Sequence, residues 1–291
     1  MNFTTQPHTG TRPNFLRRRS PGRETLLEMP IESRLALPLL RRSVSLMSLL
    51  LQDGAVDLEL AASVVGLDPG LAFGTLQLAN RNREAGAKPI WQLPMAVVEA
   101  GREALERLLH CAPQIESCSN SQSRRKLQTL VSAGVTRACV AHVLGRELGG
   151  CNPQKAYLAG LLFELPAMLQ LVSNPGDIPK AAVLSAMRHC LPAGIVWEAI
   201  ERAGEGNDGA HDPLAAIVLL AAGIVRSQIV GPSLEELAAS ALWHSWTELN
   251  HDQRCSLLVR CHEIAGLAAA NLHRMDPWEF MARLERRRPW E

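Results

Sequence analysis

The feature that most constrains this chain is a short run of small and apolar residues at positions 156–166. The run contains a single acid, Glu164, and it ends at a proline. It is too apolar to face water and too short for the roughly 20 residues of a membrane-spanning helix. Its small residues allow neighbouring helices to approach closely, while its leucines can contact different neighbours around the helix. The run therefore predicts the central helix of a soluble domain, buried on most sides.

Composition favours helices over strands. The chain has 291 residues, enough for one large or two small domains with an ample core. Hydrophobic residues make up 47% of it and aromatic residues only 4%. Alanine and leucine, both good helix formers, dominate the apolar set. We therefore expect an all-α protein.

Charge, apolar runs and cysteines narrow the classes of function. The 30 Lys and Arg against 29 Asp and Glu leave a net charge of +1, so no overall field draws the chain to nucleic acid or to a membrane. The N-terminus has no apolar signal region, and the longest uncharged apolar run, residues 213–225, is shorter than a membrane span. The 7 cysteines lack CxxC spacing, which is typical of buried thiols in a reducing cytosol. We expect a cytoplasmic protein with no membrane partner.

Short helices follow one another through the first half of the chain. Apolar residues recur at helical spacing over residues 35–51, and Asp57 can cap a second helix over residues 58–65. Asp68 and Pro69 are a cap and a first helical residue for a third helix. Asn80, near the end of that helix, is interpreted as a C-cap, with a partner contact as the alternative.

Several stretches, in one order, resemble the HDOD (HD-related output) domain, a relative of HD-type metal-dependent phosphohydrolases. Residues 156–166 resemble the run Phe-Leu-Ala-Gly-Leu-Leu-His-Asp-Ile-Gly that marks both families. The other matching motifs are Asp68-Pro69-Gly70-Leu71, Leu78-Ala79-Asn80, Ile90-x-x-Leu93-x-x-Ala96-Val97-x-x-x-Gly101 and Leu191-Pro192-x-x-Ile195. The resemblance implies a multi-helix HD-like bundle with an N-terminal helical subdomain and extra C-terminal helices.

The resemblance ends at the metal ligands. The His-Asp pair that binds metal in the catalytic family aligns with Phe163 and Glu164, and the ligands on the helices before and after it align with Ala133 and Ala222. Phenylalanine and alanine have no lone pair to offer a metal ion. His142 lies nine residues after Ala133, on the opposite face of an ideal helix, and is interpreted as a surface or packing histidine. The resemblance therefore implies a degenerate site with no catalytic residue, metal or cofactor.

Three residues are candidates for partner or pocket contacts: Asn80, Arg81 and Glu164. Arg81 replaces the serine that follows the asparagine in the family. For Glu164 we favour a carboxylate satisfied by backbone amides or by an arginine over a relic acid that lines a pocket.

The resemblance also predicts a domain organisation. The HDOD domain spans residues 30–230, as an N-terminal helical half (30–116), a serine-rich linker (117–123) and a degenerate HD-like half (124–230). Residues 1–29 form a basic tail. Residues 231–291 form a helical extension, with helices expected over residues 234–249 and 251–272 and a capping box from Asn250 and Gln253.

The resemblance implies a non-catalytic module of bacterial signal transduction that contacts a signalling protein and is compatible with a homo-oligomer. One alternative is a residual phosphohydrolase with displaced ligands, drawn from Glu164, His211 and Asp212. Another is a nucleic-acid-associated regulator that uses the arginines of residues 17–23, although nucleic acid is the less favoured partner. A third places zinc on the last helix, where His251, Cys255 and His262 fall within about 40° of one another.

Overall fold

The computed structural model describes residues 37–52, 57–81, 87–172, 198–200, 212–229, 231–243 and 247–271. Within these ranges the regular structure is helical, apart from one isolated parallel β-bridge between Leu39 and Gln114. The all-α prediction is confirmed. The basic tail, the 191–195 motif and His211 lie outside the described residues.

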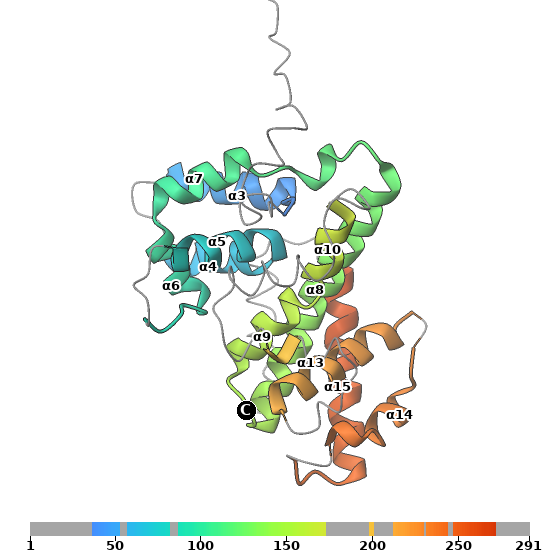
Figure 1. The fold of residues 1–291 in the computed structure, drawn as a ribbon. Coiled ribbons are helices and arrows are strands. Elements are labelled where there is room, and N and C mark those ends of the chain that lie inside the picture. The colour runs from blue at the N-terminus through green and yellow to red at the C-terminus, as the bar shows by residue number, and fades with distance from the viewer. Residues whose placement is uncertain are drawn as a thin grey trace, which may run out of the picture.

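Five helices build the N-terminal part and pack against one another, at the upper left of Figure 1. They are α3 (Arg41–Gln52), α4 (Leu58–Gly66), α5 (Pro69–Arg81), α6 (Leu93–Ala100) and α7 (Arg102–Cys111). A short 3-10 helix, η1 (Ile115–Ser117), leads from them to the rest of the molecule.

The second part is organised around the long helix α8 (Ser121–Leu148), which runs through the middle of the molecule (Figure 1). Helices α9, α10, α13 and α15 all pack against it, and α14 packs against α13 and α15. Their bounds are α9 (Pro153–Leu162), α10 (Leu165–Val172), α13 (Pro213–Ser227), α14 (Leu234–Ala238) and α15 (His251–Asn271). One continuous apolar core joins both parts.

Side chains cap several helices where the sequence predicts them. Asp57 accepts a hydrogen bond from Leu60 N, and Asn250 and Gln253 form their reciprocal pair at the start of α15. Asp68 is fully buried and accepts from Gly70 N and Leu71 N at the start of α5. It also accepts from Leu40 N at 2.8 Å, so one carboxylate ties the segment before α3 to α5.

The first helix within the described residues, α3, begins at Arg41, so the prediction of a helix over residues 35–51 is wrong for residues 37–40. Residues 37–40 run beside the end of α7: Leu39 N donates to Pro113 O, and Ile115 N donates to Leu39 O. Leu39 is buried by this pairing between distant segments. The spacing between Leu39 and the later leucines matches a helix, but Leu39 itself is not in a helix.

The serine-rich linker is shorter than predicted. Asn120 accepts hydrogen bonds from Gln122 N and Ser123 N, so residues 121–123 form the first turn of α8. Only residues 118–120 connect η1 to α8.

A single helix over residues 234–249 is also wrong. Helix α14 ends at Ala238, and a 3-10 turn, η3 (Ala241–Trp243), follows it. Trp243 is fully buried, and its Nε1 donates to Leu237 O at 2.7 Å. Burying this large side chain under α14 requires the chain to turn back. The helix expected after it, by contrast, is confirmed as α15.

Small residues bring α8 and α9 into backbone contact, as predicted for residues 156–166. A Cβ atom on Gly160 would lie 3.0 Å from Ala138 Cα and from Arg137 O. One on Gly134 would lie 3.0 Å from Leu161 O. This close crossing fixes the position of Arg137 relative to the end of α9.

Two helical segments, residues 121–148 and 153–172, are long and apolar enough to cross a membrane by length and composition alone. Both segments contain charged residues, so a search restricted to uncharged apolar runs does not detect them. In both, about half or more of the most apolar window is buried inside the protein (61% and 50%). Both belong to the packed centre of the fold, which is consistent with a soluble protein.

The prediction of buried thiols is correct for two of the described cysteines, Cys139 and Cys261. Burial raises the pKa of each to about 12, so both stay protonated and inert. Cys111 is exposed, and Cys118, Cys151 and Cys255 are partly exposed.

Candidate functional site

Three elements bring the degenerate metal-ligand positions to one region of the bundle. Ala133 is on α8, Phe163 and Glu164 form the turn between α9 and α10, and Ala222 is on α13. Helix α13 packs against both α8 and α9. The sequence alignment therefore selects positions on helices that are in mutual contact.

An arginine occupies this region. Arg137 follows Ala133 by one helical turn on α8, and its side chain is only 4% exposed. Its Nη2 donates to Glu164 Oε1 at 2.6 Å, and its Cζ lies 4.5 Å from the centre of the Phe163 ring. The interpretation of Glu164 as a carboxylate satisfied by an arginine is confirmed.

A second arginine, Arg226, lies one helical turn after Ala222, just as Arg137 lies one turn after Ala133. Arg226 is on α13, and its Nε donates to Ala222 O at 3.3 Å. Burial lowers the pKa of Arg137, its interaction with Glu164 raises it, and the positive charge of Arg226 lowers it again. The two guanidinium groups are therefore close enough to repel each other.

The described residues do not suit a metal ion. No group of three or more His, Cys, Asp and Glu side chains within them is placed to hold one. Glu164 is the one carboxylate among the four aligned positions, and a guanidinium already binds it. A hard or borderline divalent cation needs several oxygen or nitrogen donors, and this set offers one shared oxygen donor group.

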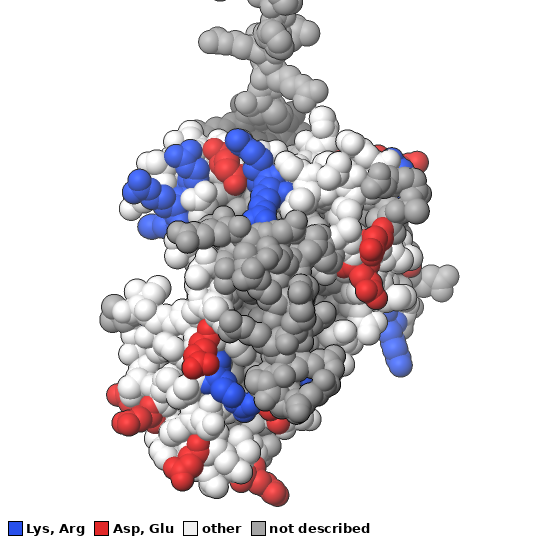
Figure 2. Space-filling model, turned by 180° about the vertical axis from the view of Figure 1, so that it is seen from behind, with Lys and Arg blue, Asp and Glu red and all other residues white. Residues whose placement is uncertain are grey.

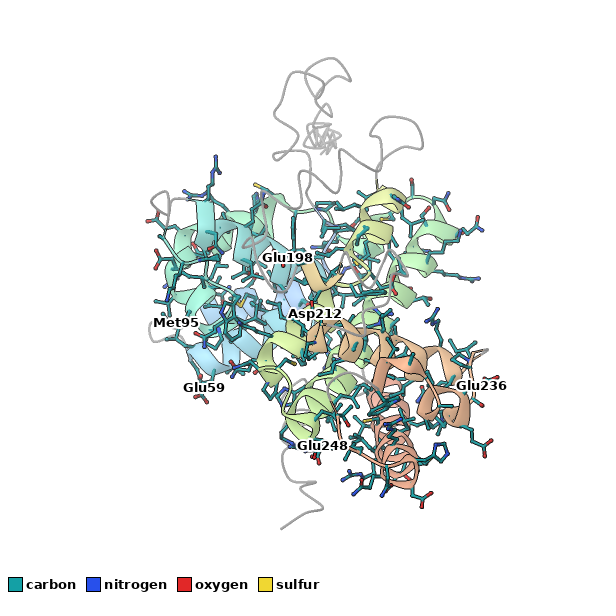
Figure 3. The ribbon with its side chains drawn as sticks, turned by 60° about the horizontal axis from the view of Figure 1, so that its bottom comes forward. Glu59, Met95, Glu198, Asp212, Glu236 and Glu248 are labelled. Atoms are coloured by element: carbon teal, nitrogen blue, oxygen red, sulfur yellow. The ribbon has the colours of Figure 1, made fainter. Side chains whose placement is uncertain are left out.

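Of the displaced ligands proposed for a residual enzyme, the two that the structure describes, Glu164 and Asp212, have separate partners. Asp212 Oδ1 accepts from Leu214 N and caps α13, whereas Ala222 and Arg226 lie in the second half of that helix. Figure 3 shows Asp212 near the centre of the view with Glu198 labelled beside it, and Glu236 at the right-hand edge. His211 lies outside the described residues.

The side chain of Asn80 is hydrogen-bonded within the chain and joins two of its segments. It lies in the last turn of α5, where its Nδ2 donates to Leu76 O and to Ile90 O, and its Oδ1 accepts from Ile90 N. It is therefore a clamp between α5 and the segment before α6, not a simple C-cap. Arg81 is exposed at the end of α5 and stays a candidate contact residue.

Of the three residues in the zinc alternative, His251 and Cys255 contact each other, and His262 contacts another helix. Cys255 Sγ lies 3.5 Å from His251 Nε2, but His262 Nδ1 lies 3.4 Å from Ser227 Oγ on α13. His251 and Cys255 are therefore neighbours, whereas the His262 side chain lies in the interface between α13 and α15.

His142 is a packing histidine, as expected. Its ring meets Tyr157 edge to face, with 6.4 Å between centroids, and Tyr157 Oη donates to Gly66 O. Burial lowers the pKa of His142, Arg146 lowers it further, and a hydrogen bond with the backbone of Pro153 acts in the opposite direction.

This lowered pKa predicts a pH dependence of stability. Below the unfolded pKa near 6.5, the unfolded chain binds more protons at His142 than the folded chain, so the free energy of unfolding falls as the pH falls. The slope from one such group is at most about 1.4 kcal/mol per pH unit. Urea unfolding at pH 7 and pH 5 should show a smaller loss for His142→Gln than for the wild type. His110→Gln, on an exposed residue of α7, should lose as much as the wild type, and equal losses in all three would contradict the assignment.

Fold and site together define an all-α protein with an HD-like core, in which an arginine–glutamate ion pair lies beside the positions aligned with the family's metal ligands. The chain belongs to the HDOD family: the model of the HDOD domain matches residues 37–195. This match ends before α13, although α13 packs on α8 and α9.

Solved structures with a similar fold include the MmoQ response regulator from Methylococcus capsulatus str. Bath. One structure of it aligns with a TM-score of 0.54 and 16% identity over 78% of this chain and 98% of that chain. A second, of a fragment of MmoQ, gives a TM-score of 0.39 and 19% identity over 87% of this chain and 90% of that chain. The first likeness supports the fold alone. The comparison with curated proteins gives no match.

Proposed function

We propose that this protein is a non-catalytic signalling module of bacterial signal transduction that acts through contact with a signalling protein. Membership of the HDOD family supports the class, and the similar fold of a protein described as a response regulator agrees with it. The observation that carries the proposal is the buried Arg137 guanidinium, which lies against Phe163 and Glu164.

A fixed positive charge opposes hydrolytic chemistry at this place. The guanidinium stays protonated in proteins, so it repels a divalent cation near Glu164 at every ordinary pH. Metal-dependent hydrolysis needs that cation to lower the pKa of the attacking water to about 7. Glu164 cannot take over the role of the cation, because a carboxylate carries negative charge and this one is already paired with Arg137.

In its described part, the face of the protein shown in Figure 2 has no large area that is basic only. Figure 2 shows both signs of charge scattered over the described part of one face, with a group of basic side chains near its upper edge. Nucleic-acid binding proteins concentrate positive charge on one face or stripe. The arginine-rich tail that motivated the alternative lies outside the described residues.

Elemental mass spectrometry of dialysed, untagged protein, together with assays of phosphomonoesterase and phosphodiesterase activity, tests the non-catalytic part. We expect substoichiometric Zn, Fe, Mn and Ni, unchanged in Phe163→His, and no hydrolysis. One equivalent of metal that disappears in Glu164→Gln would overturn the proposal. The partner part is tested by affinity capture and reconstitution of the complex from two purified proteins, and a failure to obtain any saturable complex would contradict it.

A further inference from the structure

The buried guanidinium of Arg137 has hydrogen-bond donors that Glu164 does not use. An arginine carries five N–H donors, and Glu164 accepts from Nη2. Nε and Nη1 are buried and have no hydrogen-bond partner among the described residues. Because buried polar groups are almost always paired, unpaired donors on a charged, 96% buried side chain mark a place where an acceptor is expected.

The local charges do not balance. Arg137 on α8 is paired with Glu164 in the α9–α10 turn, and Arg226 lies on α13, which packs against α8 and α9 and brings its positive charge near enough to lower the pKa of Arg137. Within the described part of the chain, no carboxylate forms an ion pair with Arg226, whose Nε is bonded to a carbonyl of its own helix. Among the described residues, Glu164 is therefore the one anion paired with either arginine, and a further anion would relieve both the repulsion between the two cations and the unpaired donors of Arg137.

We propose that Arg137 and Arg226 form a binding site for the phosphate group of a small molecule, in place of the lost metal site. Phosphate fits better than carboxylate, because Nε, Nη1 and a second guanidinium offer more donors than two carboxylate oxygens can accept. A phosphate group supplies at least three acceptor oxygens and a charge of about −1.5 to −2. The inference rests on the proposed function, since it takes the site to be free of metal and catalysis.

Phe163 and Glu164 lie between the Arg137 guanidinium and the solvent. The Phe163 ring covers the guanidinium and is itself partly exposed, and Glu164 is 21% exposed. The Phe163 side chain therefore separates the Arg137 guanidinium from the solvent on this side.

Isothermal titration calorimetry with inorganic phosphate, in a chloride buffer of constant ionic strength, tests the proposal. We expect saturable binding at one site, weakened at least about tenfold in Arg226→Met. Arg125→Met removes the same charge from an exposed position on α8 and should bind like the wild type. The double variant Arg137→Met/Glu164→Leu, which leaves no unpaired buried charge, should not bind.

The source of the phosphate is decided by repeating the titration with a nucleoside 5′-monophosphate. Tighter binding than inorganic phosphate indicates a nucleotide ligand, and equal or weaker binding indicates free phosphate. No saturable binding of either, or equal binding by the wild type and Arg226→Met, would overturn the inference. If the protein is then still free of metal and hydrolytic activity, only this inference fails, whereas bound metal or hydrolysis would overturn the proposed function itself.

Discussion

Glu164→Leu is expected to lower the free energy of unfolding by about 3 kcal/mol, because it leaves the buried Arg137 charge without its partner. Glu164 is the one acceptor that the structure gives to the Arg137 guanidinium among the described residues, and two of the three guanidinium nitrogens already lack one. The guanidinium cannot escape by losing its proton. Urea unfolding followed by circular dichroism measures the loss.

Removal of Arg137 and removal of Glu164 should lower the free energy of unfolding by different amounts. Arg137→Met should cost less than Glu164→Leu, because the Glu164 side chain is 21% exposed and water can hydrate it, whereas that of Arg137 is 4% exposed. The double variant should recover most of the stability, since replacing a buried ion pair with apolar groups is often neutral.

A matched control separates burial from ion pairing as such. Arg102 and Glu106 on α7 form an ion pair of 2.8 Å with side chains 51% and 48% exposed. Glu106→Leu should change the free energy of unfolding by less than about 1 kcal/mol. Equal losses in Glu164→Leu and Glu106→Leu, or a double variant as unstable as Glu164→Leu, would contradict the role given to Arg137.

The sequence predicts that the metal-ligand positions are degenerate, but it did not predict the ion pair between Arg137 and Glu164 that the structure shows there. Alignment of the HD run places Phe163 and Glu164, and an apolar helix with no acid places Ala222. Arginine is not a metal ligand, so the family's motif of His and Asp gives no reason to expect one here. The signal was nevertheless present: Arg137 and Arg226 each follow a replaced ligand position by four residues, which places them on the same helix face.

Features of the fold that depend on neighbouring residues were predicted, and those that depend on distant contacts were not. Asp57, Asp68 and Asn250 cap helices with atoms two or three residues away, so the sequence contains the whole interaction. The course of residues 37–40 depends on pairing with the segment after α7, and the end of α14 on the burial of Trp243. Helical spacing cannot distinguish such burial from burial on a helix face.

Gly160→Ala is expected to destabilise the protein by about 2 kcal/mol, although alanine is the better helix former by about 1 kcal/mol. The new Cβ would lie 3.0 Å from Ala138 Cα, 3.0 Å from Arg137 O and 3.1 Å from Ala138 N. All three are backbone atoms of α8, so no change of rotamer can relieve the contact. The helices must separate, and the movement would also shift Arg137 relative to Glu164.

Gly266→Ala is the matched control, because Gly266 also lies inside a long helix, α15, with Gln228 Nε2 3.6 Å from the new Cβ as its nearest neighbour. This distance is an ordinary van der Waals contact, so the variant should gain about 0.5–1 kcal/mol from helix propensity alone. Thermal and urea unfolding of both variants gives the comparison. Opposite signs are required, since a Gly160→Ala protein as stable as the wild type would show that α8 and α9 can move apart freely. The ion pair between Arg137 and Glu164 would then not be fixed by this crossing.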